Sequence, residues 1–466
     1  MKKLSLALLT LCMAQAGFTT SIVKNASQLK QAIKNKEQDI VVSGKITGLA
    51  MLTLPEGATI HGVSKDAELV FSGKGLQLSK NNTVHDLSIK TASYDIAILN
   101  DHNVEDFGVL RLNHVQTVGQ VFISAQGKNR AGTLIAHDVW VKEADVRGRA
   151  LRPHGFSVDA MQGGFTLWNM QLDENVKIKA ELNDIRIGSE KTPVRGSGVF
   201  VGGQSDWEGK GIGGSVHMDK LTTGEIYTDG GITPNAADLI SAGVFVISNT
   251  FIKEVINKEP VTTYGANDMV LDNWGTVNRW VAEKDVTSHG PSGIGFVNFA
   301  NLDHLEVKGP IITTGKGARG FNHYDGNLKT ASFLSIATTG DASIGIQVSK
   351  PMESITIDRD LSTFGAEGMS LVRGVQTKMQ AVALSIKDGG PVGKINVGGY
   401  ISTTGEKVAS VEIADKVGEL QVKEGVRALG DNSDAIRIKP DTVNVEGIKV
   451  YARDGEEITE LKDEDQ

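Results

Sequence analysis

A glycine recurs at a fixed interval through the C-terminal half of this chain and predicts a repetitive fold. Successive glycines stand 25 residues apart, except for one interval of 40 residues. They are Gly265, Gly290, Gly315, Gly340, Gly365, Gly405 and Gly430. A period in this range is typical of solenoids, in which each repeat buries its apolar side chains against its neighbours. A chain of 466 residues can therefore form one long domain.

Apolar residues flank every glycine at two constant positions. Four residues before the glycines stand Val261, Val286, Ile311, Ile336, Leu361, Ile401 and Val426. Six residues after them stand Leu271, Phe296, Phe321, Ile346, Leu371, Val411 and Ile436. Each repeat divides into three short strands, and the glycine marks a turn where a Cβ atom would clash or φ must be positive. Parallel pairing of successive repeats about 4.8 Å apart predicts an all-β solenoid, a parallel β-helix with about 25 residues per coil.

The one longer interval holds 15 additional residues, and its extra segment includes Ala381 to Ile386. We expect a partial coil or an excursion from the solenoid there. Glycine is common, with 54 residues, and aromatic residues make up only 5% of the chain, which suits short strands joined by tight turns. The net charge is −8 and Lys and Arg are scattered, so the sequence predicts no nucleic-acid partner.

The first residues have the pattern of a signal peptide. Lys2 and Lys3 precede an apolar run from Leu4 to Met13, and an Ala-x-Ala motif ends at Ala16. We expect residues 1–16 to be removed and the protein to be secreted, either to the periplasm or to the medium. A lipoprotein signal at Cys12 is the alternative, but Leu11 stands where a small residue is required. The chain has no apolar run long enough to span a membrane.

The rest of the chain divides into a cap, the solenoid and a tail. Residues 17–38 are expected to form an N-terminal cap, with a short helix from Ala26 to Glu37 and Ser27 as its N-cap. Residues 39–450 read as the β-helix, with loop insertions around residues 205–240. The polar and acidic residues 451–466 are expected to form a solvated tail.

The opening phrases resemble those of the pectate-lyase-like superfamily. They are SQLKQAI, DIVVSGKITG, LPEGATIHGV and GLQLSKNNTVHDLSIK, which together span roughly residues 26–100. The resemblance implies a right-handed parallel β-helix that begins with a capping helix. The stretch from Thr262 to Gly405 is also similar to a group of exported bacterial proteins that has no established activity.

The 25-residue step shows which distant residues become neighbours. Asn273 would stack on Asn298 and begin an amide ladder that ends at His323. His323 is adjacent to Tyr324 and Asp325, which makes this corner a candidate site. A lyase of this superfamily uses an Arg or Lys base, so the candidate catalytic residues are Arg319, His323, Asp325 and Arg373.

Such a lyase also neutralises the substrate carboxylate, often with calcium. The candidate calcium ligands are Asp268 and Asp272, although the sequence shows no compact acidic cluster. The candidate substrate-binding residues are Trp207, Trp274 and Tyr324, because aromatic rings stack on sugars. Trp207 and Trp274 are expected to be exposed, whereas Trp280 stands at a core position.

Two classes of function remain open. The first is an exported protein that binds a polysaccharide, a cell-surface glycan or another surface without catalysis. The second is a polysaccharide lyase, or a related enzyme, that acts on an acidic polysaccharide. The catalytic phrases of the superfamily's hydrolases and epimerases are missing, which favours the first class.

Overall fold

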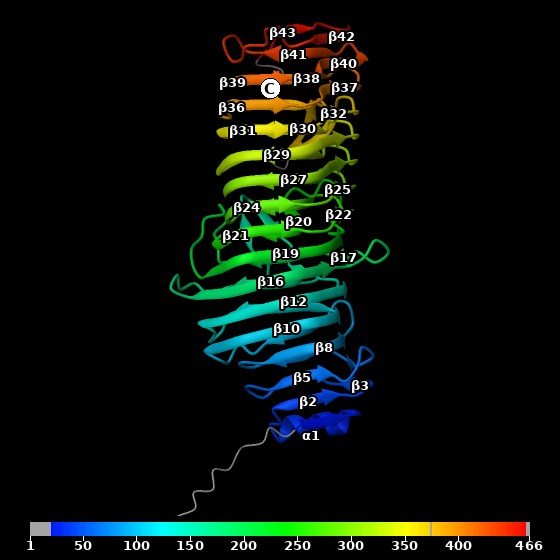
Figure 1. Cartoon of the computed structure of the whole chain (residues 1–466), viewed down its shortest axis with the longest axis vertical. Helices are drawn as coiled ribbons and strands as arrows, with labels where there is room; N and C mark the ends of the chain where they lie inside the picture. Colours follow the sequence, from blue (N-terminus) through cyan, green and yellow to red (C-terminus); the bar gives the residue numbers. More distant parts are fainter. Residues whose placement is uncertain (1–19, 373–374, 463–466) are drawn as a thin grey trace, which may run out of the picture.

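Successive coils stack along one axis and form a parallel β-helix. The computed structural model describes residues 20–372 and 375–462. Figure 1 shows the coils in sequence order from α1 (Ala26–Lys34) at one end to β43 (Ile458–Glu460) at the other. Almost all strand pairs are parallel. For example, β24 (Thr276–Ala282) pairs with β27 (Asn301–Thr313) in the 25-residue step, with Val277 opposite Leu302. The predicted fold class is confirmed.

Two sheets make up the walls of the solenoid. The main sheet contains 24 strands and bends around two sides of each coil. Its strands are β1 (Thr20–Val23), β2 (Asp39–Val42), β3 (Lys45–Leu49), β5 (Thr59–Gly62), β6 (Glu68–Phe71), β8 (Thr83–Lys90), β10 (Asp106–Val118), β12 (Ala131–Glu143), β16 (Lys177–Ile187), β17 (Val194–Arg195), β19 (Ser215–Asp229), β21 (Thr250–Asn257), β22 (Val261–Thr263), β24 (Thr276–Ala282), β25 (Val286–Ser288), β27 (Asn301–Thr313), β29 (Asn327–Thr338), β31 (Met352–Ile357), β32 (Leu361–Thr363), β36 (Val392–Val397), β37 (Tyr400–Thr403), β39 (Val417–Val422), β40 (Gly425–Asp431) and β42 (Val450–Asp454).

The side sheet closes each coil. Its strands are β4 (Leu52–Thr53), β7 (Leu76–Leu78), β9 (Ile96–Asn100), β11 (Gln120–Ala125), β15 (Gly163–Asn169), β18 (Ser197–Gly202), β20 (Leu239–Val246), β23 (Asp268–Asn273), β26 (Ile294–Asn298), β28 (Arg319–His323), β30 (Ile344–Val348), β35 (Leu384–Ile386), β38 (Ala409–Ile413), β41 (Asp434–Ile438) and β43 (Ile458–Glu460). The repeat glycines lie where the chain leaves the main sheet, most of them in the turn that leads to this sheet; Gly430 is still within β40.

The apolar residues that flank the repeat glycines fill the interior. All the residues four positions before a glycine are buried, with at most 1% of their surface exposed. The residues six positions after a glycine are equally buried wherever the structure describes their side chains. Stacking of like residues in successive coils therefore forms one continuous core along the axis.

The repeat glycines are required by contact between coils and not by positive φ. A Cβ atom on Gly315 would overlap the carbonyl oxygen of Gly290, and one on Gly340 would overlap that of Gly315. The same clash recurs at the other stacked repeat glycines, and none of them has φ in the left-handed region. Of the two reasons that the sequence suggested for these glycines, the steric one holds.

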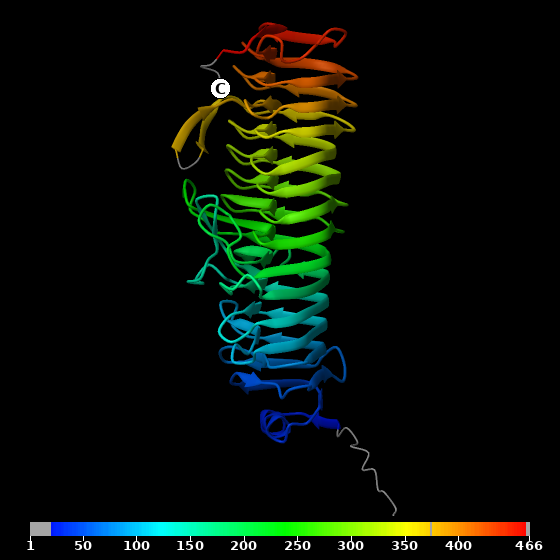
Figure 2. The ribbon, with the colours of Figure 1, turned by 90° about the vertical axis from the view of Figure 1, so that its left-hand side faces the viewer.

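The 40-residue interval contains an antiparallel hairpin, β33 (Gly368–Val372) and β34 (Val375–Met379). Figure 2 shows it projecting from the same side of the solenoid as the loops inserted in earlier coils. Ala381 to Ile386 is not the excursion, because β35 pairs with β30 in the ordinary coil position. The core position expected for Leu371 is therefore taken by Leu384, which is fully buried.

Both ends of the solenoid differ from the sequence expectations. Helix α1 (Ala26–Lys34) covers the first coil with Leu29 and Ala32, but its N-cap is Asn25 instead of Ser27. The Asn25 side chain accepts a hydrogen bond of 3.0 Å from the Gln28 N–H. At the other end, β42 pairs with β40 and β43 pairs with β41. Residues 450–460 thus form a last coil where a solvated tail was expected from residue 451.

Replacing Gly315 by Ala tests the glycine contacts. We expect Gly315→Ala to lower the free energy of unfolding by about 2–4 kcal/mol, because backbone atoms of the preceding coil must move. Urea denaturation followed by circular dichroism measures this. Gly73→Ala is the control, since a Cβ at Gly73 meets nothing within 4 Å. Equal stability of the two variants would contradict the proposed role of the glycine contacts.

Candidate functional site

A second apolar cluster lies outside the solenoid core, on the outward face of the side sheet. Outward residues of a single-layer solenoid normally face water, so apolar residues there require a cover. The cover includes a hairpin inserted between β12 and β15, formed by β13 (His154–Gly155) and β14 (Val158–Ala160). We call this set the outer cluster; its buried members are Ala160, Trp168, Phe200, Ala242, Phe245, Ile247, Met269, Trp274, Ile294 and Val297.

A cavity of about 190 Å³ remains between the side sheet and this cover. We call it the side cavity. It is lined by Phe156, Val158, Ala237, Ile240, Asn267, Met269, Asp272, Ser292, Ile294, Phe299, Arg319, Asn322 and Tyr324. The aromatic rings form a continuous wall, because the Phe156 ring lies 4.7 Å from Phe299, which lies 4.9 Å from Tyr324. Three sequence candidates therefore meet here: Asp272, Arg319 and Tyr324.

Arg319 holds a buried positive charge in the side cavity. Only 8% of its surface is exposed, and burial lowers the pKa of its guanidinium. Its Nε donates to Gln347 Oε1 at 3.2 Å and its Nη1 donates to the Gly317 carbonyl oxygen at 3.3 Å. Within the described ranges, no carboxylate lies within ion-pair distance of Arg319. Its charge is therefore neutralised by no described side chain.

Asp272 is a buried carboxyl group on the floor of the same cavity. Burial raises its pKa well above the usual value, an effect that the nearby Trp274 indole N–H opposes only in part. Neither carboxyl oxygen makes a regular hydrogen bond with a described residue. The Asn322 Oδ1 atom, also in the cavity lining, is likewise without a described partner. These atoms leave hydrogen-bonding capacity unused next to the empty space.

Asp268 has a different environment, although it is also fully buried. Its carboxylate accepts hydrogen bonds from the N–H groups of Gly230 and Gly265, at 3.0 and 2.7 Å, and from the Ser241 hydroxyl. Burial raises its pKa to about 6, and these hydrogen bonds oppose the shift. Asp268 thus stabilises a turn and does not line the cavity. The two carboxyl groups expected to bind calcium do not form one site.

The His-Tyr-Asp corner is divided between different environments. His323 points inward and is fully buried at the end of the predicted ladder, where Asn273 Nδ2 donates to Asn298 Oδ1 at 2.8 Å. The His323 Nδ1 atom lies 3.4 Å from Asn298 Nδ2. Asp325 lies in the following turn, where Lys350 Nζ is 3.4 Å from its carboxylate. Arg319, His323 and Asp325 therefore do not converge, and Arg373 lies outside the described residues.

The two tryptophans that the sequence predicts to be exposed differ in their exposure to solvent. Trp274 is 2% exposed and packs in the outer cluster, so that expectation is wrong. Its ring contacts Phe245 and Phe156, residues that the sequence places far away. Trp207 is 49% exposed, in agreement with the sequence expectation, and its ring lies 5.1 Å from that of His154. Trp280 is in the core, as expected.

Sequence reasoning missed Phe156 and Phe299, which form the apolar wall of the side cavity. One signal was present, since β26 carries Ile294 and Val297 at outward positions where a one-layer solenoid would have polar residues. Apolar residues on both faces of a strand predict that another segment covers it. The pattern does not tell which segment provides the cover.

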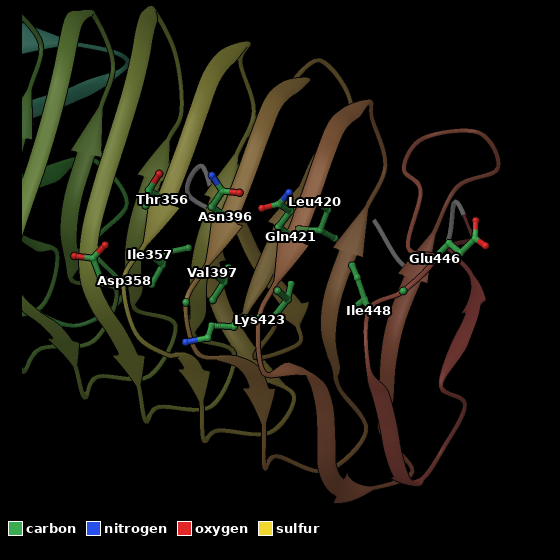
Figure 3. Close-up of a pocket in the computed structure, with 13 residues that line it drawn as sticks. Thr356, Ile357, Asp358, Asn396, Val397, Leu420, Gln421, Lys423, Glu446 and Ile448 are labelled. Carbon is green, nitrogen blue, oxygen red and sulfur yellow. The ribbon is translucent and has the colours of Figure 1, made fainter.

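A larger recess lies on the outer face of the main sheet near its C-terminal end. It has a volume of about 600 Å³ and is lined in part by β31, β36 and β39. Figure 3 shows Thr356, Asn396 and Gln421 from these three strands in a row along it. Polar and aliphatic side chains both line the groove, and none of its lining residues is aromatic. It holds none of the candidate residues.

Comparison with known proteins identifies no relative of this chain. No family model matches the chain, and neither the curated proteins nor the solved structures include a match. In the described ranges, no three His, Cys, Asp or Glu side chains are grouped as a metal ion would require. No helix of the described chain is long and apolar enough to cross a membrane.

Replacement of the two buried aspartates tests their different environments. Asp272→Asn should raise the free energy of unfolding near pH 8 by about 1–3 kcal/mol, because it removes a titrating buried carboxyl that accepts no regular hydrogen bond. The raised pKa means that the folded state holds the proton more tightly than the unfolded state. Wild-type stability therefore falls as the pH rises above about 4, and Asp272→Asn should flatten this decline.

Asp268→Asn is the matched variant, and it should lower stability, since the carboxylate accepts three hydrogen bonds. Thermal unfolding between about pH 4 and pH 8 measures both effects. Equal destabilisation by both substitutions would contradict this assignment.

His323→Asn tests the buried end of the ladder. Burial lowers the pKa of His323 to about 4, whereas an unfolded histidine titrates near 6.5. The unfolded state therefore binds more protons, and stability is lost as the pH falls from about 6.5 to 4, by up to about 3 kcal/mol. His323→Asn should remove this loss, and the exposed His289→Asn should not. If His323→Asn lost stability at acid pH as the wild type does, the assignment of this loss to His323 would be wrong.

Proposed function

We propose that this protein is exported and binds a glycan without cleaving it, through the surface of its inserted loops. Residues 1–16 have the pattern of an export signal, and the parallel β-helix is consistent with a distant relationship to the pectate-lyase-like superfamily. The observation that carries the proposal is the exposed ring of Trp207. An aromatic face on an ordered loop is the usual contact for a sugar ring.

The loop around Trp207 is held by several hydrogen bonds. Asp206 Oδ1 accepts from the N–H groups of Glu208 and Lys210, at 3.0 and 2.8 Å. The Trp207 carbonyl oxygen accepts from the Ser157 N–H at 3.1 Å, which joins this loop to the inserted hairpin. A loop whose backbone is held in this way loses little conformational entropy on binding. This preorganisation supports a binding role.

The positions of the candidate catalytic residues favour binding over cleavage. A lyase base must lie within hydrogen-bond reach of the proton that it removes, together with a group that neutralises the uronate carboxylate. His323 is buried within the solenoid, and Asp325 lies in a turn beside Lys350. Neither lies beside Arg319, so the predicted catalytic set lacks a common groove.

A polysaccharide lyase is the second candidate, and one observation favours it. Burial lowers the pKa of Arg319, which is the direction that a guanidinium base would require. Incubation with uronate polymers, with and without calcium, tests this chemistry through the ultraviolet absorbance of an unsaturated product. Activity that Arg319→Ala abolishes would overturn the binding proposal in favour of the lyase.

Replacing Trp207 by Ala tests the binding proposal. A glycan array probed with the mature protein should identify a bound glycan, and Trp207→Ala should weaken its binding by about tenfold, through the loss of stacking on the ring. Phe251→Ala is the control, because Phe251 is 40% exposed on the main sheet, where its ring stacks on His217 and not on an inserted loop. Equal loss in the two variants would exclude the Trp207 surface as the binding site.

A further inference from the structure

The side cavity is poorly suited to the sugar ring that we place at Trp207. Phe156, Met269, Ile294 and Phe299 supply most of its wall, and a volume of about 190 Å³ leaves room for a single small ring. A sugar carries several hydroxyl groups, and each would need a polar partner when it is buried. Such a wall instead matches a flat apolar ring.

The charge in the cavity determines what else the ligand must carry. A buried guanidinium without an anion is unfavourable by several kcal/mol. Arg319 makes two long hydrogen bonds to oxygen atoms of described residues, which leaves N–H donors available for a ligand. A planar guanidinium pairs best with a carboxylate, through two parallel hydrogen bonds. The missing partner is therefore an anion of this shape.

The other described polar atoms of the cavity match hydrogen-bonding groups of a ligand and not a second carboxylate. Asp272 has a raised pKa because it is buried, and in its neutral form it can donate a hydrogen bond to the ligand. The unpartnered Asn322 Oδ1 atom can accept one from a hydroxyl group on the ring. No described Lys, His or second Arg lines the cavity that could neutralise another negative charge.

We propose that the side cavity binds a small ring-bearing monocarboxylate, with its carboxylate on Arg319 and its ring against Phe156 and Phe299. Stacked and edge-on contacts with the two phenyl rings would hold the apolar body of the ligand. This inference goes beyond glycan binding, since the ligand, the cavity and the contact residues all differ from those at Trp207. It stands whether or not the glycan proposal does.

Titration of the full mature protein with benzoate, benzamide and acetate tests the proposal. Benzamide keeps the ring but lacks the charge, and acetate keeps the charge but lacks the ring. Isothermal titration calorimetry should give a dissociation constant for benzoate that is at least about tenfold lower than for either of the others. Benzoate should also raise the unfolding temperature, because it binds only the folded state. These measurements need no variant.

Arg319→Met then locates the binding site. Methionine preserves apolar volume next to Met379 and removes the buried charge, so we expect the variant to fold at least as stably as the wild type. Its affinity for benzoate should fall to that for benzamide. Arg279→Met is the control, because Arg279 pairs with Glu254 and Glu306 on the main sheet and should leave benzoate binding unchanged.

Three results would overturn the proposal. They are equal affinity of the wild type for benzoate and benzamide, no binding of benzoate at all, and unchanged benzoate affinity in Arg319→Met. Trp207→Ala should keep its benzoate affinity, because the Trp207 ring lies beside His154 and does not line the cavity. Loss of glycan binding and loss of benzoate binding are thus separate results, and a loss of benzoate affinity in Trp207→Ala would contradict the assignment to the side cavity.

Discussion

Backbone contact between successive repeat glycines sets the geometry of the coils. At this turn no side chain separates one coil from the next. The carbonyl oxygen of the repeat glycine in the preceding coil lies where a Cβ atom would be. The contact brings each coil back to the same position, so the flanking strands pair in parallel with a constant register. The continuous core then follows, because like side chains stack on like.

This constraint also explains where the chain can accept insertions. The coil that contains hairpin β33–β34 is 15 residues longer than its neighbours, yet Gly405 still lies against Gly365. The additional residues leave the solenoid as a hairpin and return to the standard path at β35. Insertions of this kind cost little if the ends of the inserted segment stay close together. In earlier coils, similar insertions cover the side sheet and create the outer cluster.

Covering one face of a solenoid changes the chemistry of the residues on that face. Arg319 and Asp272 occupy outward positions, which would be hydrated in an ordinary coil, but here the inserted segments enclose them. Burial alters the pKa of both groups and makes the unpaired charge unfavourable for stability. A site that is destabilising when empty gains stability from a ligand that completes its hydrogen bonds. The inserted segments that cover the side sheet therefore create both the cavity and the buried, unpaired charge of Arg319 inside it.

Periodic local patterns made the solenoid, its core positions, the Asn273–Asn298 pair and the burial of Trp280 predictable, because stacking converts a spacing of 25 residues into direct contact. The 25-residue spacing could not show that His323 and Arg319 point to opposite faces of β28 and have different neighbours. Nor could this spacing show that Trp274 is buried, since the Phe156 ring that packs against it belongs to an inserted segment. Contacts between an insertion and a sheet have no period, so only the folded chain brings Phe156, Asp272 and Arg319 around one cavity.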